Sequence, residues 1–138
     1  MKRKISPIAD IIAFITLFLY LKKEKFDIVH THTPKASLIG QLAAKMAGIP
    51  IIINTIHGFY FQEEDSYLKR TIFILIEKIA AKCSDLIFFV NHEDMKTASK
   101  ENIWPLHVMK YFGGGVDMQR FNSERFSEEF ILKKKQQF

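Results

Sequence analysis

The feature that most constrains this chain is a regular alternation between short apolar segments and longer helical ones. Residues that favour strands are concentrated in segments 26–31, 51–56, 86–90 and 107–112. Helices are expected between them, over 35–47, over about 66–82 and after Asn91. This order predicts an α/β fold with a doubly wound parallel sheet. The continuous apolar run 51–56 further predicts a strand that is covered on both faces.

The N-terminal segment is the most apolar helix candidate in the chain. Ser6 is placed to cap it and Pro7 to occupy its first turn, with an apolar run that continues to Leu21. A helix that is apolar on almost every side is normally buried on more than one side, so we expect it to cover the sheet. Contact with a membrane surface is the alternative, because lysine and arginine flank the run at 2–4 and 22–25. A membrane span or signal peptide is the third possibility, although the run is marginal for a span and no cleavage site follows it.

Length, charge and cysteine content bound the function. A chain of 138 residues is one domain at most, or part of one. Its single cysteine, Cys83, excludes an internal disulfide framework and a cysteine-rich zinc site. The net charge of +5 favours an anionic partner, which could be a phosphate, an acidic lipid surface or nucleic acid.

Polar residues and glycines gather where the expected strands end. Ligands of such sheets bind outside the carboxyl ends of the strands, so these positions predict the functional site. They are His30 to His32, His57 with Gly58, Asn91 with His92, and Gly113 to Gly115.

Histidines dominate this predicted site. His30 and His32 are two residues apart on a strand, so both rings face the same side and could meet one ligand. A third ligand is not evident from the spacing, which disfavours a metal site and leaves a substrate cleft or plain strand-end structure. The imidazole of His57 could donate to a sugar hydroxyl or a phosphate, and Gly58 would let the backbone approach a ligand closely.

Other motifs have simpler interpretations. The run Gly113 to Gly115 lacks the spacing of a dinucleotide-binding fingerprint and is expected to be a turn that leaves the sheet. Arg70, near the start of a helix, is a candidate for contacting an anion, although a solvated position is the commoner outcome. The aromatic loop 59–61 fits either a stacking surface or an anchor in the core.

Several of these motifs occur together in a known order. Segments 26–36, 47–50, 55–58, 77–91 and 115–121 resemble the N-terminal domain of retaining, family-four-like glycosyltransferases. The resemblance implies the GT-B architecture, in which two Rossmann-like domains face a cleft and a sugar passes from a nucleotide-sugar donor to an acceptor. It also implies polysaccharide or glycolipid synthesis on carbohydrate or lipid-linked acceptors, a cytoplasmic setting at the inner face of the membrane, no nucleic-acid partner and no resident cofactor.

The resemblance also assigns roles to individual residues. It makes His57 the histidine that reaches the transferred sugar, and Gly58 the residue that permits its turn. The residues that it places at the substrate side of the cleft are His30, His32, Lys35 and Arg70. No metal is implied.

The match covers only part of such an enzyme. We expect residues 1–122 to form a partial acceptor-side domain without its first strands, and 123–138 to be a charged tail or truncated linker. The strand at 27–31 would then be an exposed sheet edge that a second polypeptide could complete. Without a donor-binding half we expect the chain to be inactive alone. The alternative is a non-catalytic subunit that docks on a partner or a membrane.

Overall fold

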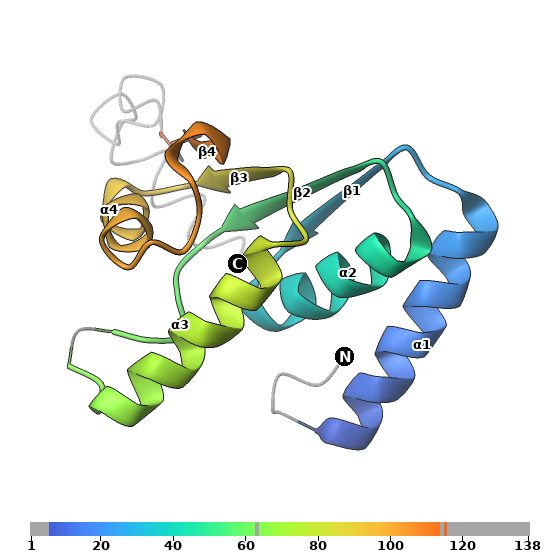
Figure 1. Ribbon diagram of the computed structural model, residues 1–138, viewed down its shortest axis with the longest axis horizontal. Helices are drawn as coiled ribbons and strands as arrows, with labels where there is room; N and C mark the ends of the chain where they lie inside the picture. The colour runs from blue at the N-terminus through green and yellow to red at the C-terminus, as the bar shows by residue number, and fades with distance from the viewer. Residues whose placement is uncertain (1–5, 63, 114, 116–138) are drawn as a thin grey trace, which may run out of the picture.

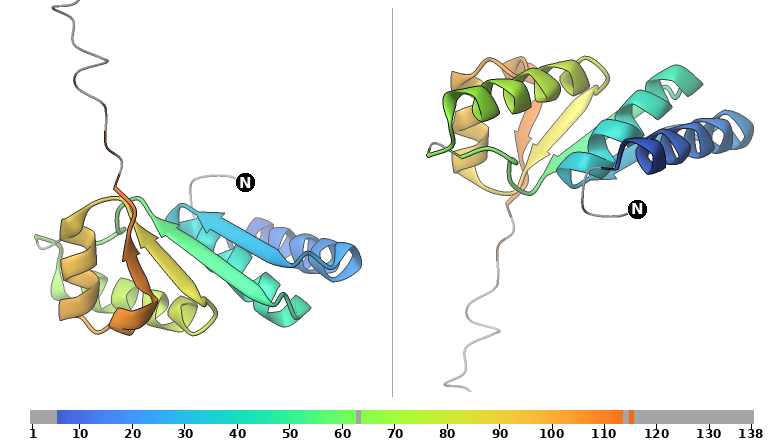
Figure 2. Two further views of the ribbon diagram at one scale, coloured as in Figure 1. Left: turned by 90° about the horizontal axis from the view of Figure 1, so that it is seen from above. Right: turned by 90° about the horizontal axis from the view of Figure 1, so that it is seen from below.

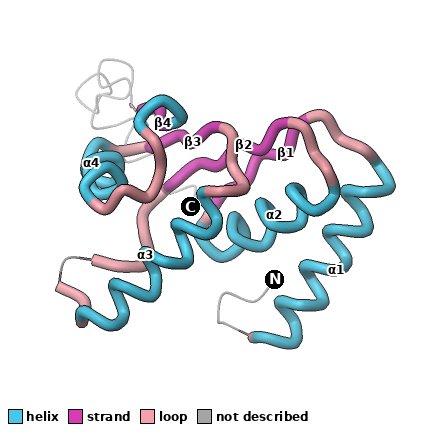
Figure 3. Tube along the Cα trace, viewed as in Figure 1, coloured by secondary structure: helices cyan, strands magenta, loops and turns pink. Residues whose placement is uncertain are grey.

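The computed structural model describes residues 6–62, 64–113 and 115. Helices and strands alternate along the chain, as Figures 1 and 3 show. The elements are α1 (Pro7–Glu24), β1 (Ile28–His32), α2 (Pro34–Ala47), β2 (Ile51–Ile56), α3 (Tyr67–Ala81), β3 (Leu86–Phe89), α4 (His92–Lys100), the 3₁₀ turn η1 (Leu106–Val108) and β4 (Met109–Tyr111). The predicted α/β order is therefore confirmed.

The strands form one parallel sheet in the order β1-β2-β3-β4. One row of paired residues across it, Thr31, Asn54, Ile87 and Met109, is almost fully buried. The helices lie on that face of the sheet (Figure 2). Because each strand pairs with the next along the chain, right-handed crossovers place every connecting helix on the same face.

The opposite face is uncovered in the part of the chain that the structure describes. Ile51 on this face is 43% exposed, and a row of paired residues on the same face runs from the exposed His32 to the exposed Lys110. The expectation that segment 51–56 would be covered on both faces is therefore wrong here. Its apolar residues do not reveal which face has a helix on it.

Local signals act at the helix ends much as the sequence predicts. The Asn91 side chain accepts a hydrogen bond from the Asp94 N–H at 2.7 Å, which caps α4. Gly48 ends α2 with φ of 79°, in the left-handed region that glycine tolerates. Ser6 stands at the cap position of α1, but its N–H donates to the Asp10 carboxylate instead of its hydroxyl capping the helix.

Helix α2 approaches the sheet through small residues. A side chain at Gly40 would place its Cβ 2.7 Å from the Thr31 methyl group on β1. Beside this contact, the Asn54 carboxamide oxygen accepts hydrogen bonds from the hydroxyls of Thr31 and Ser37, at 3.1 and 2.7 Å. This buried polar cluster joins β1, α2 and β2, and it holds the first two strands in register.

Helix α1 packs mainly on α2. Phe14, Leu17, Phe18 and Leu21 pack into a core with α2 and β2. The opposite side of α1 is exposed, and its isoleucines Ile8 and Ile11 have 77% and 59% of their surface accessible. Burial on more than one side is therefore wrong for the described residues, because nothing among them lies beyond α1.

The exposed sheet edge that the sequence predicts is present among the described strands, whereas several other predictions concern residues that are not described. Among the strands that the structure describes, β1 pairs only with β2 and is an edge, as predicted. Within the same part of the chain, no helix combines the length and apolarity needed to cross a bilayer. The basic residues at 2–4, the Gly114 turn, the boundary at 122 and the tail 123–138 lie outside the described residues.

Candidate functional site

A hollow of about 510 Å³ opens on the uncovered face of the sheet, at the carboxyl ends of the strands. We call it the histidine hollow. Its walls combine imidazoles, one hydroxyl and two phenyl rings; the lining residues are His30, His32, Thr55, His57, Phe88, Val90, Phe112 and Gly113. Its size is that of a small-molecule site, and its position is where parallel sheets bind ligands.

Strand geometry brings the three histidines together. His30 and His32 alternate with Thr31 on β1, so both rings project to the uncovered face, with centroids 4.2 Å apart. His32 is paired in register with Thr55 of β2. Two residues after Thr55, His57 follows the end of that strand, and its ring centroid lies 5.5 Å from that of His32. The rings of His30 and His32 lie on the same side of β1, as their spacing predicts, and the His57 ring lies beside them.

The histidines are linked by hydrogen bonds within the hollow. His32 Nδ1 and His57 Nε2 are 3.2 Å apart, and His30 Nε2 and Thr55 Oγ1 are 2.8 Å apart. Burial lowers the pKa of His30, and the positive charges that His32 and His57 can carry lower it further. The lowered pKa favours the uncharged His30 imidazole, which both donates and accepts hydrogen bonds.

Gly58 lets the chain leave β2 directly after His57. Its φ is 134°, a conformation that side-chain-bearing residues rarely adopt. The predicted turn is confirmed at this position. It allows His57 to stand at the rim of the hollow while Phe59 and Phe61 turn back toward the core.

The aromatic wall was not foreseen from the sequence. Phe88 of β3 lies in the same row as His32 and Thr55, and its ring meets Phe112 edge to face at 5.6 Å. Phe88 also lies 6.2 Å from the His30 ring. Only the register of β2 with β3 decides that Phe88, rather than its neighbour Phe89, faces the histidines, and sequence alone does not give that register.

Lys35 and Arg70 lie outside the hollow. The Lys35 ammonium pairs with the Asp10 carboxylate at 2.7 Å and ties the start of α2 to α1. That hydrogen bond is the main reason the pKa of Asp10 is lowered. Arg70 pairs with Glu101 at 2.5 Å and joins α3 to the end of α4. In the structure both cations have carboxylate partners and neither lines the site.

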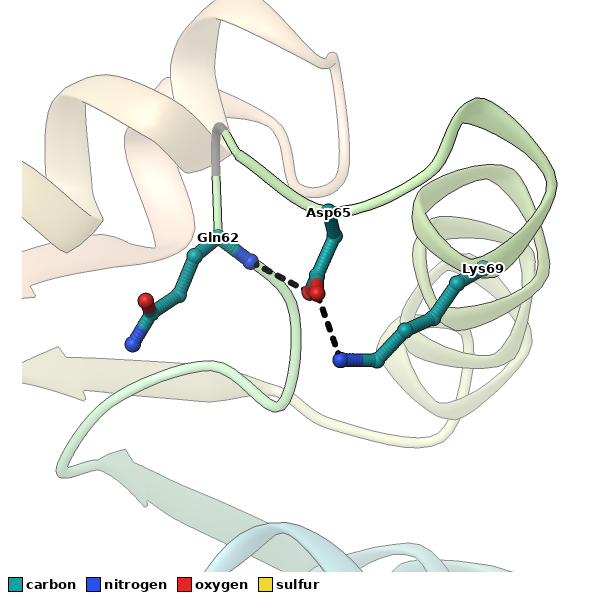
Figure 4. A network of polar contacts seen from close by, with 3 residues as sticks. All are labelled: Gln62, Asp65 and Lys69. Atoms are coloured by element: carbon teal, nitrogen blue, oxygen red, sulfur yellow. Dashed lines mark hydrogen bonds and ion pairs between the residues drawn. The ribbon is translucent and has the colours of Figure 1, made fainter.

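The loop before α3 is organised by a similar pairing (Figure 4). The Asp65 carboxylate accepts hydrogen bonds from the Gln62 N–H at 2.9 Å and from the Lys69 ammonium at 2.6 Å. The Lys69 hydrogen bond is the largest cause of a lowered pKa at Asp65. These contacts close the loop against the first turn of α3 and leave Lys69 at the surface.

Packing decides between the two interpretations of the aromatic loop 59–61, a stacking surface or an anchor in the core. Phe61 is buried, and Phe59 stacks on it with centroids 4.8 Å apart and reaches Trp104 at 6.4 Å, so this loop anchors the core. Tyr60 alone of the three remains half exposed. Among the described residues, no group of three or more histidine, cysteine or acidic side chains is arranged to hold a metal ion.

Comparison with known proteins identifies the family. The model of Glycosyltransferase Family 4 matches residues 4–120. This chain belongs to glycosyltransferase family 4. The resemblance found in the sequence motifs is thereby confirmed, and the parallel α/β layer is that of a partial Rossmann-like GT-B domain.

Curated relatives are glycosyltransferases by name. The chain is 36% identical over 119 residues to the UDP-Gal:alpha-D-GlcNAc-diphosphoundecaprenol alpha-1,3-galactosyltransferase of Escherichia coli, covering 86% of this chain and 31% of that protein. It is 36% identical over 91 residues to the capsular polysaccharide biosynthesis glycosyltransferase CapM of Staphylococcus aureus, covering 66% and 24%. The putative glycosyltransferase EpsD of Bacillus subtilis (strain 168) is 29% identical over 117 residues, covering 83% and 30%. The chain thus spans less than a third of the length of these relatives.

Proposed function

We propose that this chain is the acceptor-side part of a retaining, nucleotide-sugar-dependent glycosyltransferase, and that the sugar acceptor binds in the histidine hollow. The observation that carries the proposal is the meeting of His30, His32 and His57 with two phenyl rings at the carboxyl ends of parallel strands. The membership of the family supports the reaction class. The proposal includes no resident cofactor, since the nucleotide sugar is a substrate.

The chemistry of the hollow suits a carbohydrate. Sugars present hydroxyl groups around an apolar ring, so they need hydrogen-bonding side chains beside an aromatic surface. His57 and the Thr55–His30 pair supply the first, and Phe88 and Phe112 supply the second. Uncharged imidazoles suit sugar hydroxyls in particular, because each ring offers one donor and one acceptor. We propose His57 as the residue that contacts the transferring sugar.

The names of the relatives suggest a more specific acceptor. The Escherichia coli relative is named for a galactosyl donor and an N-acetylglucosamine diphospholipid acceptor. We propose that this chain likewise serves surface polysaccharide or glycolipid synthesis, and that it works in the cytoplasm beside the inner membrane. The net charge of +5 is consistent with a diphosphate-bearing acceptor.

The test is binding of an acceptor analogue to the chain. The probe is N-acetylglucosamine α-diphosphate with a short alkyl chain, titrated into isotope-labelled protein while the five histidine rings are followed by NMR. We expect shifts at His30, His32 and His57, and a loss of affinity of about tenfold or more in His57→Ala. His107→Ala is the matched control, because His107 is exposed on η1 and does not line the hollow. Equal affinity in wild type and His57→Ala would refute the acceptor site.

We also propose that the chain alone does not transfer sugar. Departure of the nucleotide diphosphate requires electrostatic stabilisation of the developing charge, which a donor-binding half would supply. Incubation with UDP-galactose and the same acceptor should give no product. Product formed by the purified chain would overturn this part of the proposal without affecting the acceptor site.

A second candidate function is docking on a membrane through α1. The exposed side of α1 carries Ile8, Ile11, Ile12, Ile15 and Leu19, and Lys22 and Lys23 follow in its last turn. Apolar residues beside cations suit an anionic lipid surface. Among the described strands, β1 stands at the edge of the sheet and is instead suited to pairing with a strand of a second polypeptide.

Sedimentation with vesicles separates the two kinds of docking. Equal parts of phosphatidylglycerol and phosphatidylcholine provide the anionic surface. We expect Ile11→Ser/Ile15→Ser to reduce cosedimentation, and Leu106→Ser, which removes an exposed leucine on η1, to leave it unchanged. Failure of the wild-type chain to sediment would exclude membrane docking, and strand pairing would remain the explanation for the exposed edge.

A further inference from the structure

The contact between His32 and His57 couples the two rings in a way that the proposed function does not require. His32 Nδ1 lies 3.2 Å from His57 Nε2, and both side chains are at the exposed rim of the hollow. Two neutral imidazoles at this distance share one hydrogen bond, so one nitrogen must donate and the other accept. The remaining nitrogen of each ring then takes the opposite role to its bonded nitrogen.

We propose that His32 is a positioning residue that fixes the tautomer and orientation of His57. The inference rests on the proposed acceptor site, since it concerns the atom that His57 would present to the sugar. A free imidazole exchanges between tautomers, whereas one whose Nε2 is held by a neighbour offers a single defined group at Nδ1. The hydrogen bond to His32 therefore decides whether His57 donates to or accepts from a ligand.

The surroundings hold His32 itself in place. Its ring stacks at a tilt against His30, with centroids 4.2 Å apart, and the His30 ring is fixed by its bond to Thr55 Oγ1 at 2.8 Å. Thr55 in turn is buried in β2. These contacts connect His57, which lies beyond the end of β2, to the sheet. They run from Thr55 through His30 and His32.

The experiment reads the ring nitrogens directly in the 138-residue chain. Two-bond ¹H–¹⁵N spectra of the histidines, recorded from about pH 5 to about pH 8.5, report the tautomer and the protonation of each ring. We expect His57 to hold one tautomer at the alkaline end of this range. His107 serves as the internal reference for an independent ring.

Two substitutions distinguish positioning from general structure. His32→Ala removes the hydrogen bond, so His57 should show averaged tautomers. His32→Asn keeps a hydrogen-bonding group close to the position of Nδ1, so it should restore the single tautomer. Acceptor affinity should fall about tenfold in the alanine variant and recover in the asparagine variant.

The outcomes separate this inference from the acceptor proposal. Unchanged His57 nitrogen shifts in His32→Ala would overturn the positioning role. If that variant does not fold, averaged His57 tautomers in the wild-type chain would overturn it equally. A fixed His57 tautomer together with acceptor binding that ignores His57→Ala would instead refute the acceptor site and leave the coupling of the two rings established.

Discussion

Replacement of Glu77 by glutamine should remove most of the pH dependence of stability near neutrality. Glu77 is partly buried on α3, and burial raises its pKa from 4.5 to about 7. Between these two values the folded chain keeps the proton that the unfolded chain has released. Stability therefore falls as pH rises from about 4.5 to about 7 and stays constant above that.

The magnitude follows from the two pKa values. Each unit of pKa difference corresponds to about 1.4 kcal/mol, so ionising Glu77 in the folded chain costs at most about 3 kcal/mol by pH 8. Glutamine carries no ionisable proton and has nearly the same shape. We expect Glu77→Gln to match wild type near pH 4.5 and to be more stable by up to about 3 kcal/mol at pH 8.

The assay is urea unfolding at several pH values, followed by the fluorescence of the single, buried Trp104. The lowered pKa of His30 contributes an opposite slope below pH 6.5, but it is common to both proteins and cancels in their difference. Glu64→Gln is the matched control, because Glu64 is exposed in the turn before α3. A difference between Glu77→Gln and wild type that does not change with pH would refute the reasoning.

Two further predictions concern the contact between α2 and the sheet. Gly40→Ala should destabilise the chain by about 1–2 kcal/mol, because the new methyl group meets the Thr31 methyl at 2.7 Å, and Thr31→Ser should relieve the clash in the double variant. Asn54→Leu should cost about 1–2 kcal/mol, since it removes the buried acceptor of the Ser37 hydroxyl while the Thr31 hydroxyl keeps the Ile53 carbonyl as an acceptor at 3.2 Å. Ser37→Ala removes one donor and should cost about 1 kcal/mol.

Urea unfolding at a single pH checks both predictions. Additive effects of Gly40→Ala and Thr31→Ser would contradict direct contact between these residues. An Asn54→Leu variant as stable as wild type would show that the Ser37 hydroxyl finds another acceptor and that the buried cluster does not contribute to stability.

The sequence by itself determined the elements and the edge on which the site lies. Pro7, Gly48, Asn91 and Gly58 act through local backbone chemistry, so their caps and turns can be read without knowledge of the neighbours. Apolar runs separated by helices determine a parallel sheet, and parallel strands bring their carboxyl ends to one edge. The meeting of His30, His32 and His57 follows from that rule.

Only the tertiary structure decided which face of the sheet holds the site and which side chains complete it. Phe88 enters the histidine hollow through the register of β2 with β3, while Lys35 and Arg70 are engaged by carboxylates from distant segments. Which side of an apolar helix such as α1 is covered depends on which neighbours are present. These outcomes depend on contacts between residues far apart in the chain, and no local pattern encodes the partner of a charge or the pairing of a strand.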